Sequence, residues 1–170
     1  MYLKNIQFMK KLFIISSIAL ALVSCGGGNQ QPKTESTVSE QQSTPQTYEF
    51  TINAIGNTMA EMSYDTKELK VKAGSNVKVN LTNKGSDPAM LHNIVFVKQG
   101  TEKEVAMEGL NLKDQNYFNS SNPNVIAGSA VSQPAATVTV EFTAPEPGTY
   151  TYICTYPGHW MAMQGTLIVE

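Results

Sequence analysis

Alternation of apolar and polar residues is the feature that most limits what this chain can fold into. Successive side chains of a β-strand point to opposite faces, so a period of two marks strands with one buried face. The alternating runs are 48–54, 77–82, 138–142 and 149–152. Turn-forming clusters rich in Gly, Pro, Asn and Ser separate them, at 73–76, 84–88 and 145–148. Many short strands joined by such turns predict an all-β domain at 48–170, an antiparallel sandwich or barrel.

One stretch of this domain breaks the alternation. Thr101 and Glu104 stand in capping-box order, which predicts a short helix ending near Glu108. The chain from there to about Pro134 contains many Asn residues and shows no strand period. We expect the helix and this irregular segment to form a flap over one end of the sandwich.

The N-terminus has the order of a secretory signal. Lys10 and Lys11 precede an apolar stretch at 12–23, which is shorter than the ~20 residues that a membrane-spanning helix needs. The stretch ends in Leu-Val-Ser-Cys and resembles a bacterial lipobox, in which the cysteine is lipidated and begins the mature protein. We predict a lipoprotein signal peptide at 1–24 and lipidation of Cys25; an ordinary signal with an incidental cysteine is the alternative.

Residues 25–47 are predicted to be the lipidated cysteine and a flexible linker. The linker is dominated by Gly, Gln, Ser and Thr, and Val38 is its only aliphatic residue, so it cannot bury a core. As a flexible coil it has an end-to-end distance of about 25 Å. We therefore expect an exported domain that is lipid-anchored to a bacterial membrane, on its periplasmic or extracytoplasmic face.

The charge of the chain excludes one class of partner. All 12 basic residues are lysines, against 14 acidic residues. Three of these lysines and no acid precede residue 25, so the rest of the chain carries nine lysines against 14 acids. A nucleic-acid-binding face needs clustered basic residues, usually with arginine. We expect no nucleic-acid partner.

Two histidines and one cysteine are the strong soft or borderline metal ligands of the predicted domain, namely His92, Cys154 and His159. His92 lies on the apolar face of an expected strand at 90–97, and Cys154 ends an expected strand on the side that faces the core. A free thiol in an exported protein is open to oxidation. We therefore interpret Cys154 as a ligand, although a buried cysteine and a buried histidine are each more often inert core residues.

One short loop gathers three candidate ligands. Its sequence from 154 to 165 is CTYPGHWMAMQG, and its Pro-Gly pair can return His159 to Cys154, with Met163 four residues further on. Two imidazoles and a thiolate with a weak axial thioether form blue-copper electron-transfer sites. With His92 as the second imidazole, the loop predicts one type 1 copper ion that cycles between Cu(II) and Cu(I).

Other uses of the same ligands stay open. A structural zinc usually takes four strong ligands, and this domain has three. A catalytic zinc or copper site needs an open coordination position and a general base, but the loop contains neither Asp nor Glu. A copper carrier or metallochaperone on the same fold would release its ion readily. We predict an electron carrier rather than an enzyme, with the copper carrier as the alternative.

The loop, with its Cys-x4-His-x3-Met spacing, resembles the copper loop of the azurin and auracyanin group of cupredoxins. The His92-Asn93 pair, an early strand pair at 57–74 and the segment 124–131 resemble parts of the same group. The resemblance covers nearly all of 50–170. It implies a cupredoxin-like Greek-key β-sandwich with a short helical or irregular flap, a type 1 copper site and one-electron transfer.

The resemblance also implies roles around the ligands. Asn93 would tie the two ligand segments together, and the backbone N–H groups of Asn93 and Tyr156 would donate to the Cys154 sulfur, which tunes the reduction potential. The edge of His159 would reach the surface inside an apolar patch that docks redox partners such as cytochromes or membrane electron-transfer complexes. The residues expected in this patch are Met62, Met90, Tyr156, Gly158 and Trp160.

Three features depart from the azurin pattern. Leu91 stands where azurins place the glycine whose carbonyl approaches copper, and Ile94 stands where they have tryptophan. The azurin disulfide is also absent, in line with the two cysteines of the chain.

Overall fold

The structure is a computed structural model that describes residues 45–170. The expected signal peptide, the lipidation site at Cys25 and nearly all of the linker lie outside these residues. The first strand, β1 (Thr47–Ile55), begins one residue before the expected domain start at 48. Within the described region, no helix is both long enough and apolar enough to span a membrane.

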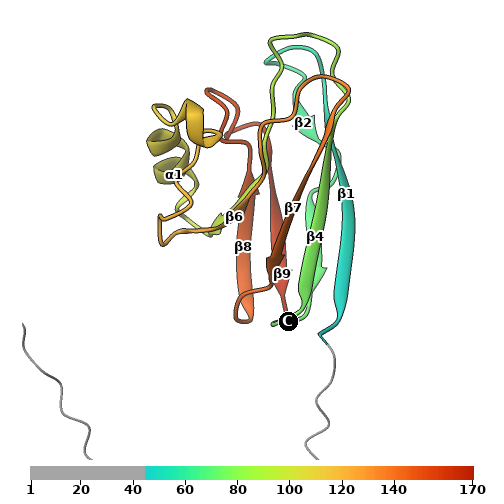
Figure 1. The fold of residues 1–170 in the computed structure, drawn as a ribbon, viewed down its shortest axis with the longest axis vertical. Coiled ribbons are helices and arrows are strands. Elements are labelled where there is room, and N and C mark those ends of the chain that lie inside the picture. Colours follow the sequence, from blue (N-terminus) through green and yellow to red (C-terminus); the bar gives the residue numbers. More distant parts are fainter. Residues whose placement is uncertain (1–44) are drawn as a thin grey trace, which may run out of the picture. The chain divides into compact units, whose positions relative to one another are not determined.

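Nine strands of the described region form two sheets that pack face to face (Figure 1). The first sheet has the order β2-β1-β4-β7 and adds to β1 the strands β2 (Ser63–Tyr64), β4 (Asn76–Asn83) and β7 (Thr137–Thr143). The second sheet has the order β3-β9-β8-β5-β6 and contains β3 (Glu68–Val71), β5 (Val95–Lys98), β6 (Val125–Gly128), β8 (Gly148–Ile153) and β9 (Gln164–Val169). The expected all-β sandwich is confirmed.

Both sheets are mixed, whereas the alternation suggested antiparallel pairing. β1 runs parallel to β4, and β3 runs parallel to β9, while the remaining pairs are antiparallel. The two strands expected within 57–74 are β2 and β3, and they do not pair with each other, because β2 pairs with β1 in one sheet and β3 with β9 in the other. Alternation determines which face of a strand is buried but contains no information on the direction of its neighbour.

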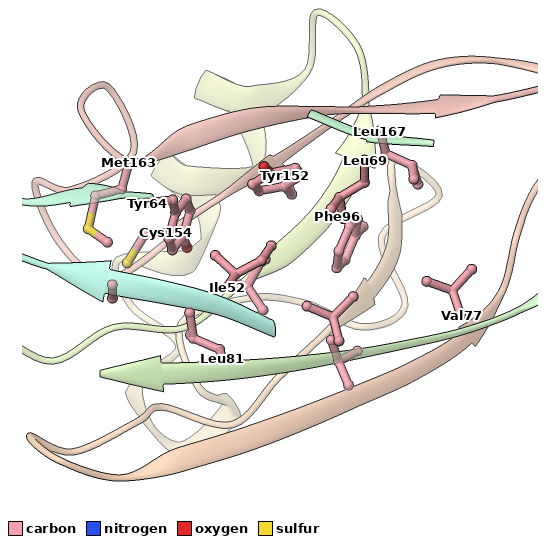
Figure 2. Close-up of a cluster of buried hydrophobic side chains, with 14 of the residues drawn as sticks. Ile52, Tyr64, Leu69, Val77, Leu81, Phe96, Tyr152, Cys154, Met163 and Leu167 are labelled. Atoms are coloured by element: carbon pink, nitrogen blue, oxygen red, sulfur yellow. The ribbon is translucent and has the colours of Figure 1, made fainter. Parts of the chain in front are cut away.

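The core lies between the two sheets and follows the alternation of the sequence. In β4, Val77, Val79 and Leu81 are buried, and the residues between them are partly exposed. Figure 2 shows side chains of both sheets meeting in this space, among them Ile52 from β1 and Phe96 from β5. Burial of these apolar faces against each other is the main force that holds the sheets together.

The flap covers the outer face of β5, which is why this strand does not alternate. Val95 and Val97 point away from the sandwich core, and both are buried against Val105 and Ala106 of the helix α1 (Glu102–Gly109) and against Phe118. A short 3₁₀ helix, η1 (Lys113–Gln115), follows α1. The flap therefore belongs to the folded domain and has a small apolar core of its own.

The helix α1 lies where the sequence predicted it, but it lacks the capping box expected from Thr101 and Glu104. The Thr101 hydroxyl donates to the Lys98 carbonyl at 2.7 Å and makes no capping bond to the helix. A carboxylate oxygen of Glu102, not of Glu104, accepts the backbone N–H of Gly100 at 3.0 Å. The Thr101 N–H donates to the same Lys98 carbonyl at 3.2 Å, so the turn after β5 occupies both Thr101 groups that a capping box would have used.

Candidate metal centre

The loop from Cys154 to Met163 connects β8 to β9 and is closed by backbone hydrogen bonds. The Cys154 N–H donates to the Met163 carbonyl at 3.0 Å, and the Met163 N–H donates to the His159 carbonyl at 2.9 Å. Ile153, which precedes Cys154, and Gln164, which follows Met163, are partners in the ladder between β8 and β9. Cys154 and Met163 are therefore held side by side at the end of the second sheet.

A tight turn brings His159 back toward Cys154, as the Pro-Gly pair predicted. The N–H of His159 donates to the Tyr156 carbonyl at 3.1 Å, which closes a four-residue turn with Pro157 and Gly158 at its centre. Gly158 has φ +85°, a conformation that glycine adopts without the steric cost other residues meet. Proline followed by glycine at these positions suits a type II turn.

His92 reaches the site from a different part of the chain. β5 begins at Val95, so His92 precedes the strand instead of lying within it as expected. A single bridge holds it, in which His92 and Ser132 exchange backbone hydrogen bonds of 2.6 and 3.3 Å. Because Val95 pairs with Ile153, this bridge stands close to the start of the Cys154 loop.

The three ligand atoms converge on one point. The two Nδ1 atoms of His92 and His159 are 3.2 Å apart, and the Cys154 Sγ lies 3.9 Å from the first and 3.7 Å from the second. Their residues are 0%, 1% and 0% exposed, respectively. A point equidistant from the three atoms is about 2.1 Å from each, which matches metal bonds to nitrogen and sulfur. One metal ion fits between them.

Burial prepares the two imidazoles for metal binding and opposes ionisation of the thiol. Burial, together with the charge of His159, lowers the pKa of His92 to about 4, and burial also lowers the pKa of His159. Both rings are therefore neutral at pH 7. Burial raises the pKa of the Cys154 thiol to about 11, although hydrogen bonds from the backbone of Asn93 and Tyr156 and from the Tyr64 side chain lower it. A metal cation must displace this proton to bind sulfur.

Met163 supplies the fourth donor of the set. Its side chain is fully buried in the same cluster as Cys154, and Figure 2 shows both sulfur atoms at the same end of the core. Met161, the other methionine of the loop, is 67% exposed. Two imidazoles, a thiolate and a thioether form a donor set that suits copper, because sulfur favours Cu(I) while imidazole accepts Cu(II).

The Asn93 side chain joins the two ligand segments to the flap. Its Oδ1 accepts the Thr155 N–H at 2.8 Å, and its Nδ2 donates to the Thr155 hydroxyl at 2.8 Å and to the Asn116 carbonyl at 2.7 Å. Asn93 follows His92 and Thr155 follows Cys154, so the bonds hold neighbours of two ligands together. The link to Asn116 was not anticipated, because no local pattern relates the flap to Asn93.

The surface over His159 differs from the expected patch. His159 is almost fully buried, and its ring packs against Tyr156, which in turn packs against Tyr117, with ring centres 4.9 and 5.0 Å apart. Met62 and Met90 are core residues, whereas Met59 and Met161 are exposed. The Met59 methyl group lies over Gly158. Sequence reasoning missed Tyr117 and Met59, since both come from loops without a recognisable period.

Comparisons with known proteins agree with this geometry. The family model described as copper binding proteins, plastocyanin/azurin family, matches residues 48–170. Auracyanin-A of Chloroflexus aurantiacus is 37% identical over 165 residues, which cover 95% of this chain and 96% of that protein. Azurin iso-2 of Methylomonas sp. strain J is 34% identical over 116 residues, which cover 64% of this chain and 90% of that protein.

Solved structures show the same likeness. The structure of auracyanin A, described as a "blue" copper protein from Chloroflexus aurantiacus, has a TM-score of 0.65 at 36% identity, covering 73% of this chain and 99% of that chain. A dithionite-reduced auracyanin from Roseiflexus castenholzii has a TM-score of 0.64 at 34% identity, covering 72% of this chain and 96% of that chain.

Proposed function

We propose that this chain, which belongs to the plastocyanin/azurin family of copper-binding proteins, carries single electrons while tethered to a bacterial membrane. It is a blue copper electron carrier and not an enzyme, and His92, Cys154, His159 and Met163 are its copper ligands. One observation carries this function, namely three buried ligand atoms that lie 3.2 to 3.9 Å from one another.

The protein prepares the site for rapid electron transfer by holding the ligands in place. The bound copper ion supplies one-electron oxidation and reduction. Backbone bonds close the Cys154 loop, and the Asn93 side chain ties that loop to the His92 segment. Ligands fixed in this way need little rearrangement when the charge of the site changes, and their burial excludes water.

Electrons enter and leave, in this proposal, through the uncharged surface over His159. No charged residue lies within the segment 155–165, and the Tyr156 ring packs directly on the His159 ring. A small apolar surface permits brief docking. We infer redox proteins as partners, such as cytochromes or membrane electron-transfer complexes. The excess of acidic residues in the mature chain favours a positively charged partner.

The tether part of the proposal rests on the N-terminal sequence. The lipobox-like segment before Cys25 supports export, removal of residues 1–24 and lipidation, and the polar segment 25–47 supports a flexible linker before the copper domain at 48–170. The likeness to Auracyanin-A covers 95% of this chain and so extends beyond residues 48–170. Anchoring would keep the copper domain on the extracytoplasmic face, close to membrane partners.

The electron-transfer function is tested by the absorption of the copper-loaded protein. We expect an intense visible band from charge transfer between the Cys154 sulfur and copper, which disappears on reduction and returns on oxidation. A colourless copper-loaded protein would contradict the proposal. Copper that passes readily to a chelator, combined with a slow redox cycle, would identify a copper carrier or metallochaperone instead.

The tether is tested separately in cells that express the full chain and are fed a labelled fatty acid. We expect label on the wild-type protein and on a Cys154→Ser control, but not on Cys25→Ser. Membrane fractionation should release only the Cys25→Ser protein. Label that survives Cys25→Ser would rule out lipidation at this residue without affecting the copper function.

A further inference from the structure

Tyr64 lies directly beneath the copper site but is not one of its ligands. It is the second residue of β2, pairs with Ala54 of β1, and has a side chain that is 1% exposed. Its ring packs against Tyr152, with ring centres 5.7 Å apart, and Figure 2 shows it beside the Cys154 sulfur. A polar hydroxyl in such a place needs a partner within the protein.

The Tyr64 hydroxyl has two acceptors within reach. It donates to the backbone carbonyl of Asn93, and the Cys154 sulfur lies beside it as a second possible acceptor. The backbone N–H of Asn93 bonds the same sulfur, so Tyr64 is also linked to Cys154 through Asn93. A phenol carries a single proton, and the two acceptors therefore compete for it.

Copper binding changes the balance between these acceptors. The metal-free thiol is neutral, so the Asn93 carbonyl is the stronger acceptor. A metal-bound sulfur is a thiolate, and hydrogen bonds to charged acceptors are roughly twice as strong as neutral ones. The full burial of Cys154 and Tyr64 strengthens this preference, since little water screens the charge.

We propose that the Tyr64 hydroxyl is a third hydrogen-bond donor to the Cys154 sulfur in the copper-bound protein, and that it raises the reduction potential of the site. This inference rests on the proposed function as an electron carrier. The other two donors, from Asn93 and Tyr156, are backbone groups, so Tyr64 is the donor that a substitution can remove. Tyr64 acts through Cys154 and is a positioning residue, not a ligand.

The direction of the effect follows from charge. When the copper ion gains an electron, its positive charge falls and the sulfur retains more negative charge. A donor aimed at the sulfur then stabilises the reduced protein more than the oxidised protein. Stabilising the reduced form raises the reduction potential, and removing the donor lowers it.

The test compares Tyr64→Phe with Tyr152→Phe in the copper-loaded protein. The Tyr152 hydroxyl also donates to a backbone carbonyl, that of Thr66 at 2.8 Å, so the control loses the same group and a similar bond in the same core. We expect Tyr64→Phe to lower the reduction potential and to move the charge-transfer band to longer wavelength. Tyr152→Phe should leave both unchanged.

A visible band with an unchanged or raised potential in Tyr64→Phe would overturn the inference while leaving the electron-carrier function intact. If the wild-type protein lacks the band, the proposed function itself fails. The two failures are therefore distinguishable.

A second measurement uses the wild-type protein, in case Tyr64→Phe does not fold. The protein is loaded with cadmium-113, and nuclear magnetic resonance detects coupling from the metal nucleus through sulfur to protons that hydrogen-bond it. We expect coupling to the Tyr64 hydroxyl proton as well as to the N–H protons of Asn93 and Tyr156. Coupling confined to the two N–H protons would overturn the inference.

Discussion

The two segments that supply the copper ligands are built in different ways. The Cys154–Met163 loop places three ligands with bonds between residues close in sequence, such as the turn closed from His159 to Tyr156. His92 comes from 62 residues before Cys154 and is placed by its bridge to Ser132 and by the neighbouring side chain of Asn93.

This difference predicts which substitutions should affect only the copper site and which should also affect the stability of the domain. Local bonds survive changes elsewhere, so a defect in the loop should alter the site and leave the sandwich intact. The His92 segment is held by pairing between distant strands, so a defect there should also lower the stability of the domain.

Replacing Cys154 with serine should abolish the charge-transfer band completely. Serine keeps the size of the side chain but cannot supply the thiolate on which the band depends. Absorption of the copper-treated protein measures the loss, and far-ultraviolet circular dichroism should show an unchanged sandwich. If the variant unfolds, the loop is less independent of the fold than the comparison states.

Replacing Asn93 with alanine should destabilise the metal-free domain by about 3 kcal/mol or more, since each buried partner left unsatisfied costs about 1–3 kcal/mol. The partners are the Thr155 N–H, the Thr155 hydroxyl and the Asn116 carbonyl. Urea denaturation measures the free energy of unfolding. As a control, Asn119→Ala removes two exposed bonds, one to Glu108 and one from the Ser121 N–H, and should change it by less than about 1 kcal/mol. Equal effects of the two variants would show that Asn93 does not join the segments.

Lowering the pH should weaken copper binding because protons compete with copper for its ligands, first at the Cys154 sulfur in the loop and at lower pH at His92. The pKa of the Cys154 thiol is raised to about 11, so copper must displace one proton throughout the neutral range and its affinity should fall about tenfold per pH unit. The pKa of His92 is lowered to about 4, so its ring is neutral above that value and competes for a proton only below it. His159, whose pKa is also lowered by burial, adds a second competing proton, so the slope should be steepest below about pH 4.

This pH dependence is measured with Cu(I) and a competing chelator in the absence of oxygen. An affinity that stays constant across the neutral range would mean that the thiol is already ionised in the metal-free protein. That result would contradict the effect of burial on Cys154.

Replacing Gly158 with alanine should cost about 1 kcal/mol of stability, because its positive φ is unfavourable for other residues. The added methyl group would also meet the Met59 side chain, so we expect a small shift of the copper band. Gly74→Ala is the matched control, with φ +71° and open space around it, in the turn between β3 and β4. It should lower stability similarly and leave the band unmoved. A band shift in both variants would show that the geometry of the copper site depends on residues outside the loop.

Much of the site could be predicted because its information is local. Cys154, His159 and Met163 lie within one loop, and the Pro-Gly pair indicated how that loop turns. The orientation of His92 toward the core also followed from its place beside an apolar run. The exposure of the surrounding methionines did not follow, since Met62 and Met59 differ in burial although they are three residues apart in one loop.

The structure does not test the prediction of lipidation at Cys25. It depends on the N-terminal segment, which lies outside the described residues, and it stays a prediction until the labelling experiment is done. The copper function does not depend on its outcome.

The sequence by itself determined which face of each strand is buried, where the helix lies and which residues can bind copper. These properties arise from alternation and from short-range spacing, both of which can be seen within a few neighbouring residues. The tertiary structure alone decided that β1 pairs in parallel with β4 and β3 with β9, that Tyr64 lies beside the Cys154 sulfur, and that Asn116 meets Asn93. Such contacts depend on how the whole chain buries its apolar faces together, because they join residues that are neighbours only after the two sheets have packed.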